Sequence, residues 1–221
     1  MMDVSRLGGG YADSLADASA TVTALLECAQ PGSAASRLVV VAGPPGSGKS
    51  ALGARLLEEI PGSLHLDKDW TAAGFILSAA KEAGIDEARA YGWALYWSQL
   101  RPQEYAGALR TACANLVGRR VVLLSGGWGP ELAVTELWEG LAARIAPSQL
   151  VVMHLDPPPL KTWRARLEQR GTRFDSDADF ARFAAAVCQF DIWADVIHLD
   201  AGQSPSALAQ TALTHLFSAT G

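Results

Sequence analysis

Residues 38–50 read LVVVAGPPGSGKS, and this stretch decides the fold. Its first part, Leu38–Ala42, is a short run of apolar, mostly β-branched residues, which is typical of a strand buried on both faces. Its second part, residues 43–50, has the pattern G-x-x-x-x-G-K-S, and the composition of residues 51–60 favours a helix. A strand, a glycine-rich loop and a helix in this order form a cradle for a phosphate group.

Each residue type in this phosphate loop (residues 43–50) has a physical role. Gly43, Gly46 and Gly48 let the backbone point successive N–H groups at a phosphate, in conformations that a Cβ would obstruct. The helix that follows adds the positive end of its dipole, Lys49 adds a charge near the outer phosphates, and the Ser50 hydroxyl is a ligand for Mg²⁺. The implied ligand is ATP or GTP. We expect it to contact Gly43, Pro44, Pro45, Gly46, Ser47, Gly48, Lys49, Ser50 and Ala51.

From residue 37 onward, short β-branched runs alternate with helical stretches, which predicts a parallel sheet with helices on both faces. The fold class is therefore α/β, with three layers and a five-stranded parallel sheet. The expected strands are Leu38–Ala42, Leu64–Leu66, Val121–Ser125, Leu150–Leu155 and Val196–Leu199.

Two segments lie outside this alternation. Residues 1–36 have a glycine-rich start and an alanine-rich amphipathic stretch, so we expect an N-terminal helical appendage to a domain of residues 37–221. About fifty residues separate the second and third strands, far more than one crossover helix needs. These residues are rich in Ala, Trp and Tyr, and we expect a helical cap over a substrate at about residues 70–117.

Two carboxylates follow the second expected strand, in the sequence LHLDKDW of residues 64–70. The carboxyl ends of parallel strands share one edge of the sheet, so Asp67 and Asp69 are expected beside the phosphate loop. A carboxylate there can accept the proton of an attacking hydroxyl, or hold Mg²⁺ through water. The alternative is a capping role, taken by Asp69 if the next helix begins there.

The segment after the fourth strand, residues 156–171 (DPPPLKTWRARLEQRG), has the acidic cap, early prolines and closing glycine of a helix. Arg166 and Arg170 lie four residues apart on it, where like charges repel. An anion between the two guanidinium groups would offset this repulsion, and guanidinium groups suit phosphate oxygens. The alternative is an exposed basic face near the C-terminal end of the helix. We expect an arginine-bearing lid at about residues 157–178.

These segments together resemble the P-loop small-molecule kinases, the group that includes chloramphenicol phosphotransferase, gluconate kinase and zeta toxin. The resemblance lies in GPPGSGKS at 43–50, LDKD at 66–69, the approach to the third strand from RPQEY (101–105) to RRVVLL (119–124), and R-x-R-x-x-x-R-G at 164–171. It covers about residues 37–200. It implies a P-loop NTPase fold like that of the nucleoside monophosphate kinases, with ATP and Mg²⁺ as cofactors.

The resemblance also implies roles by position. It implies an ATP site at Gly46, Gly48, Lys49 and Ser50. Lid arginines clamp the triphosphate in this family, which gives that role to Arg166 and Arg170. The Asp after the second strand is the general base, which implies Asp69, with Asp67 as the second choice. The candidate catalytic residues are therefore Asp69, Asp67, Lys49, Arg166 and Arg170.

The end of the third strand departs from the family pattern. Many relatives carry an acidic residue there, but Val121–Ser125 is followed by Gly126-Gly127-Trp128. Without that carboxylate, Mg²⁺ would be held by Ser50, the phosphates, water and Asp67. The departure leaves open the hypothesis that the protein binds a nucleotide as a sensor and catalyses little.

Aromatic residues are concentrated in the expected cap, where they suit a planar or amphipathic acceptor. They are Trp70, Phe75, Tyr91, Trp93, Tyr96, Trp97 and Tyr105. The alternative for Trp93, Tyr96 and Trp97, which have helical spacing, is the buried face of a helix. Arg89, Arg101 and Glu104 either recognise a polar acceptor or are solvated.

The histidines and cysteines favour neither a metal centre nor a disulfide framework. His65, His154 and His198 fall on expected strands, so core or edge positions are favoured over metal ligation. The three cysteines are odd in number and widely spaced, which is typical of a protein in the reducing cytoplasm.

Length, charge and hydropathy narrow the class further. The 221 residues fit one α/β domain, and the formal net charge of −5 disfavours a nucleic-acid partner. The apolar runs are far shorter than the roughly 18 residues of a membrane span. Three hypotheses remain: a kinase that phosphorylates a hydroxyl of a small molecule such as an antibiotic or a metabolite, a nucleoside or nucleotide kinase, and a nucleotide-binding regulatory protein.

Overall fold

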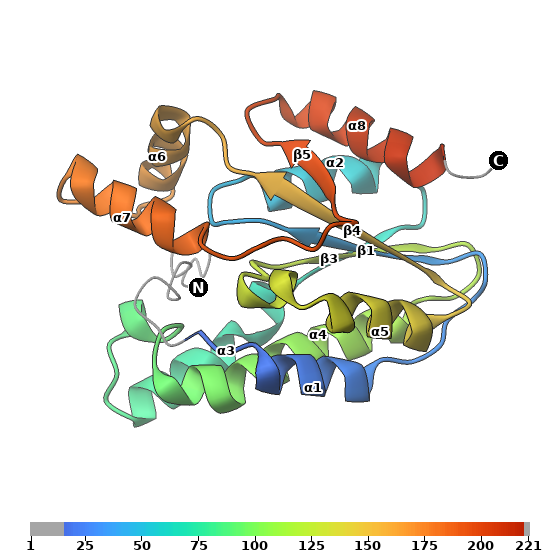
Figure 1. Ribbon diagram of the computed structural model, residues 1–221, viewed down its shortest axis with the longest axis horizontal. Helices are drawn as coiled ribbons and strands as arrows, with labels where there is room; N and C mark the ends of the chain where they lie inside the picture. The colour runs from blue at the N-terminus through green and yellow to red at the C-terminus, as the bar shows by residue number, and fades with distance from the viewer. Residues whose placement is uncertain (1–15, 219–221) are drawn as a thin grey trace.

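Five parallel strands form the central sheet of the computed structural model, which describes residues 16–218 (Figure 1). Their order across the sheet is β2-β3-β1-β4-β5, so the strand that leads into the phosphate loop is the central one. The five predicted strands are confirmed, and their observed ends lie within one residue of those expected. The strands are β1 (Arg37–Ala42), β2 (Leu64–Asp67), β3 (Val121–Ser125), β4 (Gln149–Asp156) and β5 (Ile197–Asp200).

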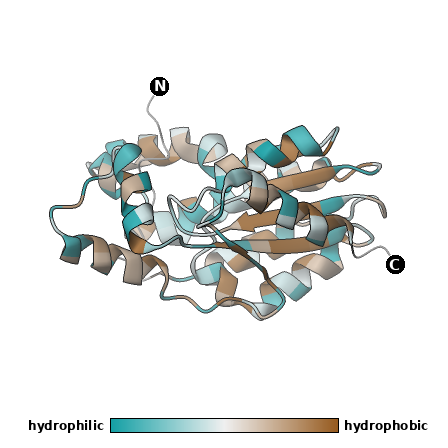
Figure 2. Ribbon diagram, turned by 90° about the horizontal axis from the view of Figure 1, so that it is seen from above, coloured by the Kyte–Doolittle hydropathy of each residue, from teal (hydrophilic) through white to brown (hydrophobic). Residues whose placement is uncertain are grey.

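Helices cover both faces of the sheet, which gives the three predicted layers (Figure 1). On one face, α2 (Lys49–Glu59) and α8 (Pro205–Phe217) pack together over Val39 and Val41. On the other face, α4 (Arg101–Ala114) and α5 (Thr135–Ile145) pack over the alternate β1 residues Leu38 and Val40. Because β1 is covered on both sides, its sequence is continuously apolar. Figure 2 shows the strands as the most hydrophobic ribbons of the molecule.

The helix expected in residues 1–36 is α1 (Ser19–Cys28). It lies against α4 and α5, and its Leu25 is fully buried in the same core cluster as Leu38 of β1. Residues 16–36 therefore contribute to the core of the domain rather than extending from it. Residues 1–15 of the expected appendage lie outside the described residues.

The segment between β2 and β3 is helical, as predicted for a cap. It contains α3 (Lys68–Glu82), a 3₁₀ turn at Glu87–Arg89, a π-helical turn at Tyr96–Leu100, and α4. In the expected lid, α6 (Leu160–Gln169) is followed by α7 (Asp177–Val187), which continues beyond residue 178. A third hydrophobic cluster joins α3 and the π-helical turn to α6 and α7, so the lid helices pack against the cap.

The carboxyl ends of the strands point to the side of the molecule on which α3, α6 and α7 lie (Figure 1). A 3₁₀ turn at Pro130–Ala133 follows β3 at the same edge. No helix within residues 16–218 is long and apolar enough to cross a membrane.

Candidate active site

A cavity of about 630 Å³ lies at the carboxyl edge of the sheet. Its walls come from the phosphate loop, the start of α3, the cap, α6 and the start of α8. Two of the candidate residues, Gly43 and Pro44, do not line it. The candidates that do are Pro45, Gly46, Ser47, Gly48, Lys49, Ser50, Ala51, Asp67, Asp69, Arg166 and Arg170.

The phosphate loop has the backbone conformation that its glycines predict. Gly43 has a φ of +141°, and a Cβ there would lie 2.8 Å from the Leu155 carbonyl oxygen. Gly46 has a φ of +77°, and a Cβ there would lie 3.0 Å from the Leu167 side chain of α6. Both positions therefore require glycine, the first because of β4 and the second because of the lid helix.

Lys49 points into the phosphate loop. Its Nζ donates hydrogen bonds to the carbonyl oxygens of Gly43 (2.8 Å) and Pro44 (2.9 Å). Burial lowers the pKa of this ammonium to about 8; Asp69 and Asp67 oppose the shift, and Arg170 adds to it. The Ser47 hydroxyl is buried and has no hydrogen-bond partner among the described residues. The loop thus contains a cation and a polar oxygen without an anionic partner of their own.

Asp67 ends β2 and caps α3. Its Oδ1 accepts a hydrogen bond from the backbone N–H of Asp69 (3.1 Å), so Asp67 is the N-cap and Asp69 lies in the first turn. The expected alternative of a capping role is therefore confirmed, but Asp67 takes it and not Asp69, because the helix begins at Lys68. The Ser50 hydroxyl donates a long hydrogen bond of 3.4 Å to Asp67 Oδ2. One residue thus both caps a helix and reaches the phosphate loop.

The residue at the end of β3, where many relatives carry an acid, is Ser125. Ser125, the last residue of β3, pairs in register with Asp67 on the neighbouring strand. The Ser125 hydroxyl is hydrogen-bonded to His65 Nε2 at 2.7 Å. A carboxylate therefore reaches the neighbourhood of Ser50 from β2 instead of β3.

Asp69 is held by the lysine that precedes it. Lys68 Nζ lies 2.5 Å from Asp69 Oδ1 and 2.8 Å from Glu104 Oε1. Burial raises the pKa of Asp69, but Lys68 beside it, with Lys49 and Arg101 further away, outweighs burial and holds that pKa below its usual range. Asp69 is therefore a carboxylate at neutral pH. Its side chain is 36% exposed, so a ligand in the cavity can reach it.

Arg101 and Glu104 are buried, which excludes the expectation that they are solvated. The Arg101 guanidinium makes two hydrogen bonds to Glu131, at 2.8 and 2.6 Å, and donates a third to Tyr96 Oη at 3.1 Å. The Tyr96 hydroxyl in turn donates to Glu104 Oε2 at 2.9 Å. These residues continue the network that begins at Asp69 and Lys68. Arg89, by contrast, is exposed.

The aromatic residues of the cap divide into two groups. Trp70, Tyr91, Tyr96 and Tyr105 line the cavity, whereas Phe75, Trp93 and Trp97 do not. Tyr96 and Trp97 are also buried, at 1% and 5% exposure, as the alternative of a buried helix face predicts. Tyr96 therefore both lines the cavity and belongs to the buried face of a helical segment.

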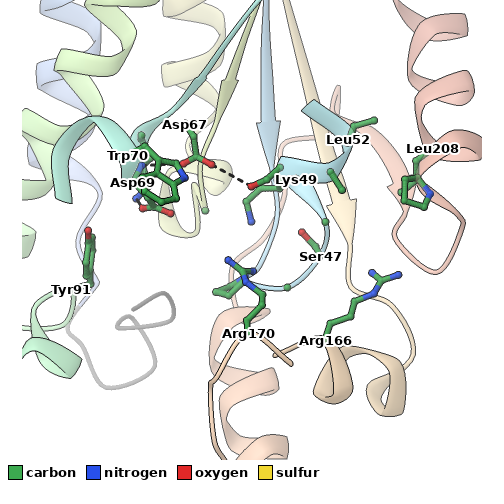
Figure 3. Close-up of a pocket in the computed structure, with 18 of the residues that line it drawn as sticks. Ser47, Lys49, Leu52, Asp67, Asp69, Trp70, Tyr91, Arg166, Arg170 and Leu208 are labelled. Carbon is green, nitrogen blue, oxygen red and sulfur yellow. Dashed lines mark hydrogen bonds and ion pairs between the residues drawn. The ribbon is translucent and has the colours of Figure 1, made fainter. Parts of the chain in front are cut away.

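The lid helix α6 contacts the phosphate loop directly. Trp163 Nε1 donates a hydrogen bond of 2.7 Å to the Pro45 carbonyl oxygen. Arg166 donates to the Ala201 carbonyl oxygen at 3.0 Å, in the loop between β5 and α8. In Figure 3, Arg166 and Arg170 lie below the phosphate loop, and Asp67 and Asp69 lie to the left of Lys49. The two predicted arginines and the two predicted carboxylates thus line one cavity from different elements.

Several solved structures share this arrangement of strands and helices. A gluconokinase from Sinorhizobium meliloti 1021 is 17% identical, with 85% of this chain and 93% of that chain covered and a TM-score of 0.50. A tunicamycin resistance protein from Deinococcus radiodurans is 18% identical, with 82% and 96% covered and a TM-score of 0.52. A third protein, from Chloroflexus aurantiacus, is 22% identical, with 84% and 98% covered and a TM-score of 0.53. No family model and no curated protein sequence matches the chain.

The chain has the fold of the P-loop kinases. Within this fold, sequence reasoning missed two residues of the network around Asp69. Lys68 could have been found from the sequence, because it lies between the two carboxylates of LDKD (residues 66–69). Glu131 could not have been, because it belongs to a short turn after β3, and only the fold brings it to Arg101.

The P-loop kinase fold also brings together two histidines that the sequence places far apart. His154 Nδ1 lies 2.7 Å from Asp156 Oδ1, and His198 Nδ1 lies 2.9 Å from the same oxygen. These side chains form a group on β4 and β5 whose ligand atoms lie within 4.8 Å of one another. His154 is buried on the inner strand β4 and His198 is exposed on the edge strand β5, so the expected core or edge positions are confirmed, and the fold places the two histidines side by side.

Proposed function

We propose that the protein is an ATP- and Mg²⁺-dependent phosphotransferase that phosphorylates a hydroxyl group of a small molecule. One observation carries the proposal: a single cavity is lined by the phosphate loop, two carboxylates and two arginines. In-line phosphoryl transfer needs a cradle for the donor, a carboxylate toward the attacking hydroxyl, and positive charge around the transferred group. The shared fold of the gluconokinase supports the same class of reaction.

The phosphate loop fits the phosphates of a nucleotide. Lys49 can exchange the carbonyl oxygens of Gly43 and Pro44 for phosphate oxygens, which are stronger acceptors for an ammonium group. The buried Ser47 hydroxyl is available as a further donor. Arg166 of α6 and Arg170 at its C-terminal end provide guanidinium groups for the outer phosphates.

Ser50 and Asp67 fit a magnesium ion. Their side-chain oxygens lie 3.4 Å apart, and hydroxyl and carboxylate oxygens are the donors that Mg²⁺ prefers. Ser50 would bind the ion directly, and Asp67 would hold it through water. When bound, Mg²⁺ neutralises part of the phosphate charge.

Asp69 is the residue that we assign to the acceptor. As a carboxylate beside the cavity, it accepts a hydrogen bond from the acceptor hydroxyl. It receives the hydroxyl proton as the bond from the acceptor oxygen to the γ-phosphorus forms and the bond from that phosphorus to the bridging oxygen breaks, which releases ADP. Lys68 fixes its position through a 2.5 Å contact with Oδ1. The lowered pKa makes Asp69 a weak base, which suits a loose transition state in which the hydroxyl is oriented first and deprotonated late.

The proposal is tested by ADP release from Mg-ATP in the presence of a library of hydroxyl-bearing small molecules. We expect ADP release to depend on an acceptor. Asp69→Asn is expected to lower kcat by about 10²- to 10⁴-fold while ATP affinity changes little. Asp86→Asn is the matched control, because Asp86 is an exposed carboxylate that caps the turn at Glu87–Arg89, and asparagine also caps.

One outcome would contradict the proposal: tight ATP binding with no transfer to any acceptor would indicate a nucleotide-binding regulatory protein. Saturable transfer to a nucleoside or nucleotide, and to no other alcohol, would restrict the acceptor class and identify the alternative, a nucleoside or nucleotide kinase.

We also propose that the protein acts in the cytoplasm on a small-molecule acceptor and not on nucleic acid. All three cysteines, Cys28, Cys113 and Cys188, are free, which supports a reducing compartment. The net charge of −5 disfavours contact with a phosphate backbone.

A further inference from the structure

We propose that the acceptor bound beside Asp69 carries no negative charge, and is a neutral or cationic alcohol with a ring that packs against tyrosine and tryptophan side chains. This inference rests on the proposed function, because it concerns the acceptor part of the same cavity. That part is lined by Lys68, Asp69, Trp70, Tyr91, Arg101 and Tyr105. Two of these residues are basic, so their existing partners decide whether an anion can bind.

Lys68 is already neutralised by two carboxylates. Its ammonium group contacts Asp69 at 2.5 Å and Glu104 at 2.8 Å, and its side chain is 7% exposed. The same ammonium lies 5.0 Å from the centre of the Tyr105 ring, which occupies another side of it. A carboxylate on the acceptor would have to displace one of these two acidic partners.

Arg101 is also neutralised, and its side chain is 1% exposed. Its guanidinium is paired with Glu131 through two hydrogen bonds, and Glu131 is fully buried. The central carbon of the guanidinium lies over the rings of Trp97 and Tyr105, at 4.6 and 4.4 Å from their centres. Breaking this pair would leave a buried, uncompensated carboxylate, which is strongly unfavourable.

The formal charges around the acceptor part of the cavity therefore sum to a negative value. Lys68 and Arg101 are outnumbered by the carboxylates of Asp69, Glu104 and Glu131. Burial raises the pKa of Glu104, but a proton on Glu104 would only balance the charges and would not create a free cation. Among residues 16–218, an anionic acceptor would meet no unpaired positive group in this part of the cavity, and Asp69 would repel it.

A further polar group of the acceptor part, the Tyr91 hydroxyl, suits a neutral ligand. Tyr91 is 7% exposed, and its hydroxyl has no hydrogen-bond partner among residues 16–218. Burial raises the pKa of this phenol, so it remains a neutral hydroxyl that can donate or accept one hydrogen bond. Trp70, which is 56% exposed, adds an open indole face (Figure 3). Together they offer a hydrogen bond and ring contacts without a net charge.

The test is direct binding of ring-bearing alcohols prepared as matched sets. One set is methyl 4-(hydroxymethyl)benzoate, the free 4-(hydroxymethyl)benzoate anion, and 4-(aminomethyl)benzyl alcohol; a panel of similar sets varies the ring. Binding to the full chain is measured by ligand-detected NMR and calorimetry. We expect the neutral and cationic members to bind at least about tenfold more tightly than the anions.

Variants make the test specific for this cavity. Tyr91→Phe is expected to weaken binding of the neutral probes about fivefold, whereas Trp93→Phe, in the same cap but outside the cavity lining, is expected to leave it unchanged. Glu104→Gln frees one contact of Lys68 and is expected to narrow the difference between ester and anion. If Glu104→Gln fails to fold, the Tyr91→Phe and Trp93→Phe pair still decides.

The outcomes also separate this inference from the proposed function. Anions that bind as tightly as their esters, or a panel in which no neutral or cationic member binds, overturn the inference. Phosphoryl transfer to an anionic acceptor overturns the inference and leaves the phosphotransferase proposal standing. Selective binding of neutral probes without any transfer supports the acceptor class and contradicts the catalytic proposal.

Discussion

At the scale of single residues, Lys49 shows how the phosphate loop is prepared for a ligand. Its ammonium group is satisfied by two backbone carbonyl oxygens, which are neutral, and burial holds its pKa at about 8. Phosphate oxygens favour the charged form of this lysine more than carbonyl oxygens do. Nucleotide binding must therefore raise the pKa of Lys49 and take up a proton at alkaline pH.

This linkage predicts the pH dependence of ATP binding. Below pH 8, Lys49 is already charged, so its titration does not make the affinity for ATP depend on pH. Above pH 8, the affinity for ATP is expected to fall by up to about tenfold per pH unit. Calorimetry with ATP between pH 7 and 9.5 measures the slope. Lys49→Arg is the matched variant, because arginine stays charged over this range and is expected to remove the slope. A wild-type affinity that is flat to pH 9.5 would contradict the proposed contact.

The two lid arginines are expected to differ in their kinetic effects. Arg166 already makes a hydrogen bond to the Ala201 carbonyl oxygen beside α8, whereas Arg170 lies closer to the ammonium of Lys49 and lowers its pKa. We expect Arg170→Ala to lower kcat about 100-fold or more with a small change in KM for ATP, because charge there stabilises the transferred group. Equal losses in kcat and in ATP affinity would show that Arg170 is a ground-state clamp.

At the scale of elements, α6 and the phosphate loop behave as one packed unit. Trp163 is hydrogen-bonded to the Pro45 carbonyl oxygen, and Gly46 leaves no room for a side chain against Leu167. The same helix carries Arg166 and Arg170. Gly46 therefore lets α6 pack close to the phosphate loop, and this packing sets the position of the two arginines in the cavity.

Gly46→Ala is the substitution that tests this packing. The added Cβ meets Leu167 at 3.0 Å and the backbone has a φ of +77°, so both contact and conformation oppose it. Gly84→Ala is the control, because Gly84 has a φ of +69° and no atom within 4 Å of the added Cβ. Each variant is expected to lose about 1–2 kcal/mol of unfolding free energy from the backbone conformation. Only Gly46→Ala is expected also to weaken ATP binding; equal ATP affinity in both variants would contradict the packing argument.

At the scale of the whole molecule, the features that could be predicted from the sequence are those that a short stretch of consecutive residues determines. The central strand, the phosphate loop and the helix after it follow from thirteen consecutive residues and the run that follows them, and the alternation of β-branched and helical stretches gave the five strands. The arginine pair was visible because the spacing lies within one helix. The network around Asp69 was not, because Glu104 and Glu131 come from α4 and from the turn after β3, and only tertiary packing brings them to Lys68 and Arg101.

The same limit applies to α1, whose sequence shows an amphipathic helix but not its partner. In the fold, Leu25 is fully buried between α4 and α5, while Leu57 of α2 is 40% exposed. Leu25→Ala is therefore expected to lower the free energy of unfolding by about 2–5 kcal/mol, as for other buried leucines. Leu57→Ala, the matched control, is expected to stay within about 1 kcal/mol of the wild type. Urea denaturation measures both values, and a Leu25→Ala loss no larger than that of Leu57→Ala would mean that α1 does not belong to the core of the kinase-like domain.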